Sequence, residues 1–206
     1  MKKLLLLLFL GFTLVGFSQT LIPDPNFEQA LIDLGIDSGT INGSVPTANI
    51  SDVTYLDVYN NNITDLTGIE DFTALTHLYC DSNQLISLDV SNNTALATLW
   101  CNSNQLTSLD VSNNTALTYL DCQSNQLTSL DVSNNTALTT FWCNNNQLTS
   151  LDVSNNTDLT ELGCYNNQLT SLDVSNNTAL TYLNCHSNQL TSLDVSNNTA
   201  LTYLNC

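Results

Sequence analysis

The residues most able to do chemistry are seven cysteines, each 21 positions after the previous one, and the chain has no other cysteine. If they lie on stacked strands, their Cα atoms are ~4.8 Å apart, a distance that a disulfide can span. Their Cα–Cβ bonds would run parallel, however, which leaves the Cβ atoms also ~4.8 Å apart, beyond the usual ~3.5–4.5 Å. No close-spaced pair typical of a zinc site occurs. We therefore expect buried free thiols that act as small apolar residues, with a disulfide between neighbours or a metal site as the alternatives. The cysteines are Cys80, Cys101, Cys122, Cys143, Cys164, Cys185 and Cys206.

The constant spacing indicates one short structural unit that is copied along the chain, each copy burying its apolar side against its neighbours. Other residues recur in step with the cysteines. Leu75, Leu78, Asn83, Leu85 and Leu88 return 21 residues later as the same residue types. A diverged unit precedes the first cysteine unit, so that residues 53–206 hold seven full coils and the start of an eighth. The sequence therefore predicts a solenoid.

The pattern LxxLxCxxNxLxxL resembles the leucine-rich repeat with cysteine in its third apolar position, and residues 63–75, ITDLTGIEDFTAL, are similar to the repeats of internalin-type proteins. The resemblance implies short parallel strands around Leu-x-Cys that form one curved sheet. It also implies that Asn83 and its equivalents turn inward and bond neighbouring backbone. We expect the Asp-Val-Ser-Asn-Asn-Thr segments to carry the chain around the convex side through Asx-type turns.

Three segments are predicted. Residues 1–18 are typical of a secretory signal peptide, since Lys2 and Lys3 precede an apolar run that is too short for a membrane span. Residues 19–52 form an N-terminal cap with a short helix, which Asp24 can cap and Gly35 can end; Phe27, Ala30, Leu31 and Leu34 share one face. Residues 53–206 form the repeat domain. Because the sequence stops inside a strand at Cys206, we expect it to be a truncated part of a longer protein.

Charge limits the possible partners. The formal net charge is −17, and both basic residues lie in the predicted signal peptide. Nucleic acid is excluded because phosphate binding depends on Lys and Arg, anionic lipid is disfavoured for the same reason, and we expect no membrane insertion of the mature chain. Cationic proteins, divalent cations and neutral glycans remain, and the acidity can also serve solubility alone.

One aspartate recurs in each turn segment. Like charges ~5 Å apart repel, so some interaction must offset this column. Each carboxylate can accept N–H bonds from its own turn, or Ca²⁺ can bind weakly between coils, for example at Asp110, Asp131 and Asp152. We favour the first interpretation, and predict no metal site, because each coil offers one carboxylate and Ca²⁺ takes about six or more oxygens. The column comprises Asp89, Asp110, Asp131, Asp152, Asp173 and Asp194.

Variation between coils concentrates in three columns, at three residues before, one before and one after each cysteine position. These columns hold every Tyr, Trp and His of the chain. Tyr and Trp are enriched at binding hot spots, whereas a general preference for strand-forming residues would equally favour Val and Ile, which are absent there. We predict a ligand-binding concave face. Its residues are Tyr79, Trp100, Tyr119, Trp142, Asp121, Glu161, Tyr165, Tyr182 and His186.

Catalysis is not expected. His77 and His186 lie five coils apart, about 24 Å at ~4.8 Å per strand, so they cannot share a site, and no cofactor motif occurs. We interpret the chain as a non-catalytic recognition or adhesion module, secreted or at the cell surface, that binds a protein through its concave strand face. The alternatives are a glycan-binding surface module and a purely structural spacer.

Overall fold

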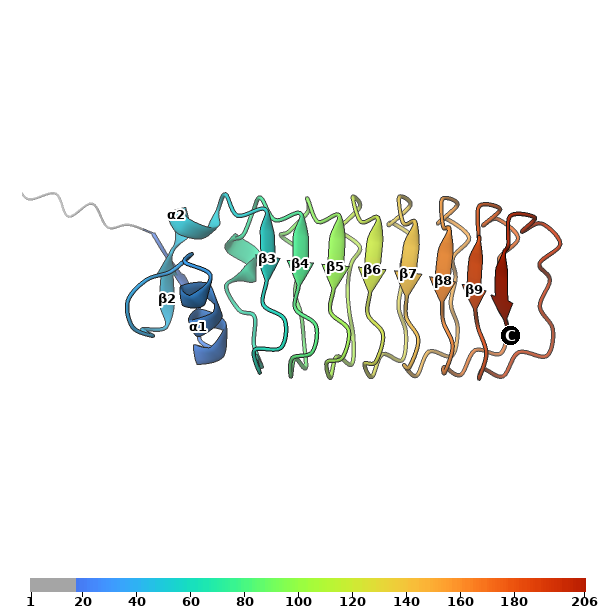
Figure 1. Cartoon of the computed structure of the whole chain (residues 1–206), viewed down its shortest axis with the longest axis horizontal. Coiled ribbons are helices and arrows are strands. Elements are labelled where there is room, and N and C mark those ends of the chain that lie inside the picture. The colour runs from blue at the N-terminus through green and yellow to red at the C-terminus, as the bar shows by residue number, and fades with distance from the viewer. Residues whose placement is uncertain (1–17) are drawn as a thin grey trace, which may run out of the picture.

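The computed structural model describes residues 18–206, and it shows an elongated solenoid behind a small N-terminal unit (Figure 1). The predicted signal peptide therefore lies, except for Ser18, outside the described residues. The solenoid carries one eight-stranded parallel sheet in which each strand pairs with the next along the chain. These strands are β3 (Tyr55–Asp57), β4 (His77–Tyr79), β5 (Thr98–Trp100), β6 (Tyr119–Asp121), β7 (Thr140–Trp142), β8 (Glu161–Gly163), β9 (Tyr182–Asn184) and β10 (Tyr203–Asn205). The predicted leucine-rich-repeat architecture is confirmed.

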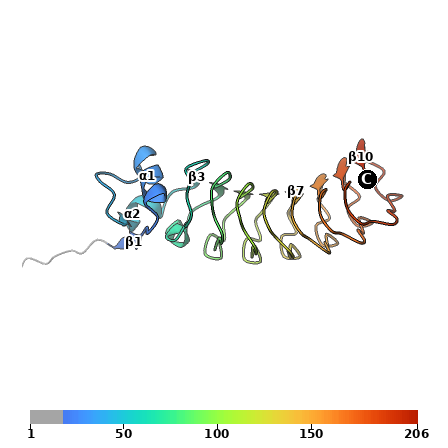
Figure 2. The same cartoon turned by 90° about the horizontal axis from the view of Figure 1, so that it is seen from below.

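Each strand has three residues, of which the middle one points inward and the outer two point away from the core. The register has no offset, so Leu99 of β5 pairs with Leu120 of β6, and equivalent residues form straight columns. Viewed along the strands, the solenoid is bent, and the strands lie on the inner side of the bend (Figure 2). The outward residues therefore share one concave face, as predicted. A short 3-10 helix, η1 (Ile69–Asp71), lies in the first coil.

The cysteines line the core. All seven are free; Cys80 to Cys185 are buried and Cys206 is exposed. Burial raises the pKa of the Cys185 thiol to about 11, and it raises the pKa of the deeper thiols further. The interpretation of a column of buried apolar thiols is confirmed for the first six.

An inner asparagine ladder runs beside the cysteines. The Asn104 Nδ2 donates to the carbonyl oxygens of Cys80 and Cys101 at 3.0 and 3.1 Å, and its Oδ1 accepts from Leu85 N at 3.0 Å. Each asparagine therefore joins two coils through backbone groups that the turn would otherwise leave without partners. The preceding residue, such as Ser103 with φ 54°, is left-handed. The ladder comprises Asn83, Asn104, Asn125, Asn146, Asn167 and Asn188.

A second asparagine ladder was not predicted. The Asn-Asn pairs were expected only to belong to Asx-type turns on the convex side, but the second member of each pair is also buried. Asn114 is fully buried, and its Nδ2 donates to the carbonyl oxygens of Val90 and Asn93, both at 2.9 Å. The turn thus ties each coil to the preceding one. The second ladder comprises Asn93, Asn114, Asn135, Asn156, Asn177 and Asn198.

The predicted helix is present as α1 (Pro25–Asp33), and Asp24 caps it by accepting from Asn26 N at 2.8 Å. The other Asp24 oxygen accepts from Thr64 N at 2.7 Å, in the first coil, which links the helix to the solenoid. Gly35 follows the helix with φ 72°.

Two features of this unit differ from expectation. Leu34 is 49% exposed, because it is the residue that ends the helix and is not on the packed face of its last turn. In addition, β1 (Gln19–Leu21) and β2 (Ser44–Pro46) form an antiparallel pair, followed by α2 (Thr47–Ile50), in a cap for which only the one short helix was predicted. Within residues 18–206, no helix is long and apolar enough to cross a membrane.

Candidate functional site

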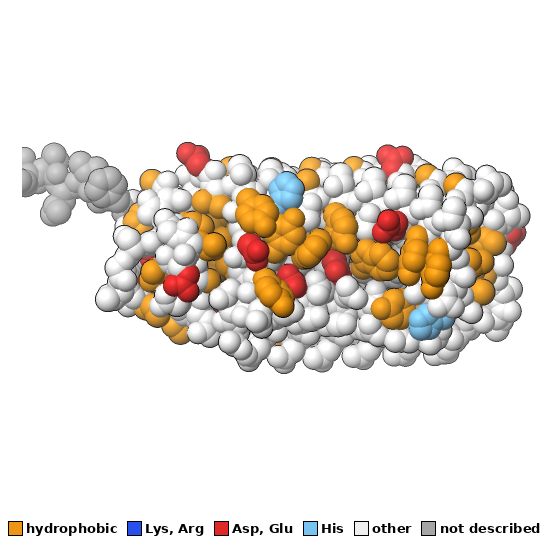
Figure 3. Space-filling model, in the orientation of Figure 1, with side chains coloured by type: hydrophobic (Ala, Val, Ile, Leu, Met, Phe, Trp, Pro, Cys, Tyr) orange, Lys and Arg blue, Asp and Glu red, His pale blue; other side chains and the backbone are white. Residues whose placement is uncertain are grey.

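The concave face carries a row of aromatic side chains with carboxylates among them (Figure 3). Its first part spans β3 to β6. The Tyr79 and Trp100 rings meet edge to face with centroids 4.9 Å apart, and the Trp100 and Tyr119 rings lie 5.6 Å apart. Tyr55 packs on Tyr79 at 5.2 Å. Tyr79, Trp100 and Tyr119, three of the residues predicted for the concave face, are therefore in contact.

The second part of the row spans β7 to β10. Trp142 contacts Tyr182 at 5.4 Å, and Tyr182 stacks on Tyr203 at 4.4 Å with nearly parallel rings. Tyr119 and Trp142 lie on the adjacent strands β6 and β7, so the second part continues the first along the face. We call the whole set the aromatic row: Tyr55, Tyr79, Trp100, Tyr119, Trp142, Tyr182 and Tyr203.

Gly163 explains why Trp142 leans toward β9. A Cβ atom at Gly163 would lie 2.1 Å from Cε3 of Trp142, so the indole lies directly over this glycine. Gly163 belongs to the varied column one residue before the cysteines, and no role was predicted for it. The available signal was that glycine occurs in that column only once, directly beside a tryptophan in the predicted register.

Tyr165 and His186 lie in the third column, beside the aromatic row. Their rings stack at 4.8 Å with an interplanar angle of 15°. Glu161, half-buried, lies between Thr140 and Tyr182 in the register. All nine predicted residues are thus on one face. Their role in binding a ligand stays a prediction.

Two acidic residues of this face are buried. Asp121, which lies between Trp100 and Trp142 in the register, is only 7% exposed, and Asp81 is also buried. Burial raises the pKa of both carboxyls; hydrogen bonds from Gln123 partly oppose this at Asp121. Large side chains on the neighbouring strands exclude water from Asp121. The alternation of inward and outward residues along one strand does not predict this burial.

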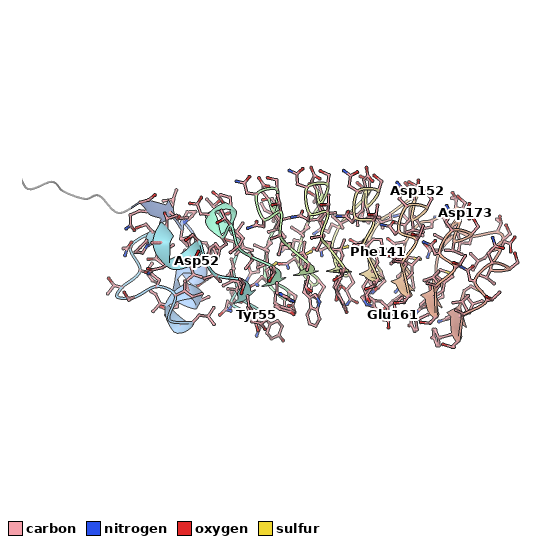
Figure 4. All side chains as sticks on the ribbon, turned by 90° about the horizontal axis from the view of Figure 1, so that it is seen from above. Asp52, Tyr55, Phe141, Asp152, Glu161 and Asp173 are labelled. Carbon is pink, nitrogen blue, oxygen red and sulfur yellow. The ribbon has the colours of Figure 1, made fainter. Side chains whose placement is uncertain are left out.

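The turn aspartates form a different environment. Asp152 and Asp173 lie on the opposite side of the solenoid from Tyr55 and Glu161 (Figure 4). In each turn the aspartate Oδ1 accepts from the backbone N–H of the serine two residues later at 2.9 Å, as Asp131 does from Ser133. These serine hydrogen bonds lower the pKa of every carboxyl in the column. The interpretation of locally bonded turn aspartates is confirmed.

The described residues bring together no group of three or more His, Cys, Asp or Glu side chains that could hold a metal ion, at Asp110, Asp131 and Asp152 or elsewhere. The two histidines make separate local contacts: Nδ1 of His77 lies 2.9 Å from Oγ1 of Thr76, and Nδ1 of His186 lies 2.8 Å from Oγ of Ser187. What the concave face offers is non-covalent contact through aromatic rings, amides and carboxylates.

Comparison with known proteins supports this architecture. Residues 52–93 match the family model for leucine-rich repeats (2 copies), and residues 143–167 match that of the LVIVD repeat. Internalin J of Listeria monocytogenes serotype 4b (strain F2365) is 46% identical over 71 residues, which are 34% of this chain and 8% of that protein.

Two solved structures are similar. The functional domain of InlJ from Listeria monocytogenes, described as including a cysteine ladder, is 36% identical with a TM-score of 0.58; the match covers 93% of this chain and 52% of that one. Internalin C2 of the same species is 20% identical with a TM-score of 0.68, covering 89% and 95%, a likeness of fold alone. The chain thus spans about half of the InlJ domain and a small part of Internalin J.

Fold, repeat pattern and cysteine column together define a leucine-rich-repeat solenoid. The chain is an internalin-like leucine-rich-repeat protein with a cysteine ladder.

Proposed function

We propose that the chain is an exported, non-catalytic recognition module that binds a protein partner through its concave strand face. The aromatic row is the observation that carries this proposal. Tyr and Trp provide large contact areas with few rotatable bonds, and they dominate protein interfaces energetically. Here they lie side by side on a rigid sheet, whose neighbouring strands hold them through continuous backbone pairing.

Charge supports a protein partner with a basic surface. Residues 18–206 contain no Lys or Arg, so every formal side-chain charge of the face, histidines aside, is negative. Complementary charge speeds association and selects among partners. Export is supported by the signal-like segment at residues 1–18, and the likeness to internalins agrees with a role in protein interaction.

The test is to immobilise the full chain and measure binding to a panel of purified basic cell-surface and secreted proteins and to a glycan array. A Trp100→Ala/Trp142→Ala variant removes two anchors of the row. We expect the parent chain to bind at least one protein and the variant to bind it at least about tenfold more weakly, because hot-spot residues contribute about 2 kcal/mol or more each.

The matched control is Ile86→Ala, which truncates an apolar side chain that is 65% exposed and lies outside the three columns. This variant should bind like the parent. Equal binding by the parent and the double tryptophan variant would contradict a concave binding face. Binding to glycans alone, or to nothing in the panel, would contradict a protein partner.

A further inference from the structure

The surroundings of Asp121 combine a buried carboxylate with aromatic rings. In the register, Asp121 has Trp100 on one side and Trp142 on the other, and Tyr119 precedes it by two residues on the same strand. Trp142 leans toward Gly163 and away from Asp121, while Trp100 packs against Tyr79 and Tyr119. The carboxylate thus lies between two indoles that do not contact each other through their rings.

This carboxylate has no cationic partner within residues 18–206, which contain no Lys or Arg. Both of its hydrogen bonds come from Gln123, whose backbone N donates at 3.1 Å and whose Nε2 donates at 2.9 Å. Removing a carboxylate from water without an opposite charge is costly, and a stable fold gains nothing from it. Such a group at a binding surface is a candidate functional group.

Two buried side-chain oxygens beside Gln123 have no donor, and the buried Nε1 of Trp100 has no acceptor. The Gln123 Oε1 already accepts from Nδ2 of Asn144 at 2.9 Å, and the Asn144 side chain is fully buried. The Asn144 Oδ1 has no hydrogen-bond partner, and neither has Oδ1 of Asn102 on the other side of Gln123 in the third column. A group that fits this arrangement supplies several N–H donors and a positive charge.

A guanidinium group has these properties. It carries five N–H donors and no acceptor, it pairs with carboxylates, and it stacks on aromatic faces more readily than an ammonium group does. We propose that Asp121, with Trp100 and Trp142 beside it, is the anchor for an arginine side chain of the protein partner, an inference that rests on the proposed function. In the free protein the side-chain amide of Gln123 occupies the donor position that the arginine takes on binding.

The experiment uses the fact that Trp100 and Trp142 are the only two tryptophans of the chain. In a ¹⁵N–¹H spectrum of the full chain they give the only two indole N–H signals, and both report on the proposed anchor. The probes are N-acetyl-arginine amide and N-acetyl-citrulline amide, which have nearly the same shape but differ in charge. We expect the arginine probe to shift both indole signals saturably, and citrulline at equal concentration and ionic strength to leave them in place.

Two variants with the same change of charge sharpen the test. Asp121→Asn should weaken the affinity for the arginine probe at least about tenfold, because it removes the charge that the guanidinium pairs with. Asp131→Asn, on the opposite side of the solenoid, should leave the titration unchanged. The dispersion of the two indole signals before titration shows that each variant is folded.

Equal shifts by arginine and citrulline, no shift by either, or equal affinity of Asp121→Asn and the parent would overturn the anchor. None of these results depends on a macromolecular partner. They are therefore distinguishable from failure of the proposed function, which the protein panel tests separately.

Discussion

The turn segments and the concave strand face differ in how strictly their residues repeat. The stretch QLTSLDVSNNTALT recurs unaltered at residues 105, 126, 168 and 189, whereas the outward strand columns change from coil to coil. The structure gives a physical reason. Turn residues supply hydrogen bonds to the preceding coil, through the second asparagine ladder, or to their own turn, through Asp-to-Ser contacts. Outward strand side chains supply none of the bonds that hold the sheet, so they are free to vary.

The comparison predicts that changes in the turn reduce stability and that changes on the strand face mainly reduce binding. The largest effect is expected at the second asparagine ladder. Asn135→Ala removes two hydrogen bonds, to the carbonyl oxygens of Val111 and Asn114, both 2.9 Å long, from a fully buried side chain. At about 1 kcal/mol per bond we expect a loss of about 2 kcal/mol in the free energy of unfolding, measured by chemical denaturation.

The neighbouring residue is the matched control. Asn134→Ala changes the other member of the same Asn-Asn pair, which is exposed and makes one bond of 3.3 Å to the carbonyl oxygen of Ser112. Its cost should be well under about 1 kcal/mol, since exposed single bonds contribute little. Similar costs for the two variants would mean that the ladder does not explain why the turn repeats so strictly.

A smaller effect is expected at the one strand-face position where packing restricts the residue. Gly163→Ala places a Cβ atom where the Trp142 indole lies, so the indole must move or the strand must shift. Overpacking of this kind costs ~1–3 kcal/mol in a core. Gly163 is buried but the Trp142 indole over it is only half-buried and can move, so we expect about 1 kcal/mol, together with a shift in tryptophan fluorescence. In a Trp142→Ala background the same substitution should cost nothing, because the clash is gone; an unchanged cost would assign the effect to the backbone.

The sequence was sufficient to predict the solenoid, the inward asparagines of the Asn83 column and the helix that begins after Asp24, because each rests on a repeated spacing or a local capping pattern. It could not predict the second asparagine ladder: Asn92 and Asn93 are the same residue type in one turn, and only the path of the backbone decides which is buried. The burial of Asp121 depends on neighbouring strands rather than on its own. The β1 and β2 pair has three residues per strand, too few to show a period.

The smallest effects concern the ionisation of the two sets of carboxyls, and here the comparison predicts opposite signs. Serine hydrogen bonds lower the pKa of Asp131 in the folded state, so its contribution to stability is present above its ordinary pKa and is lost as pH falls through the lower, folded value. Burial raises the pKa of Asp121, so the folded chain binds this proton more tightly than the unfolded chain does, and the folded state becomes more stable as pH falls through that raised value.

Titration of the ¹³C carboxyl signals should place Asp131 below the ordinary aspartate pKa and Asp121 above it. In denaturation experiments, the stability difference between the parent and Asp131→Asn should shrink as pH falls below the ordinary aspartate pKa. Any stability advantage of Asp121→Asn over the parent should instead shrink at a higher pH, as Asp121 takes up its proton. A common pKa for both carboxyls would remove the distinction between a turn that stabilises its charge and a strand face that holds one at a cost.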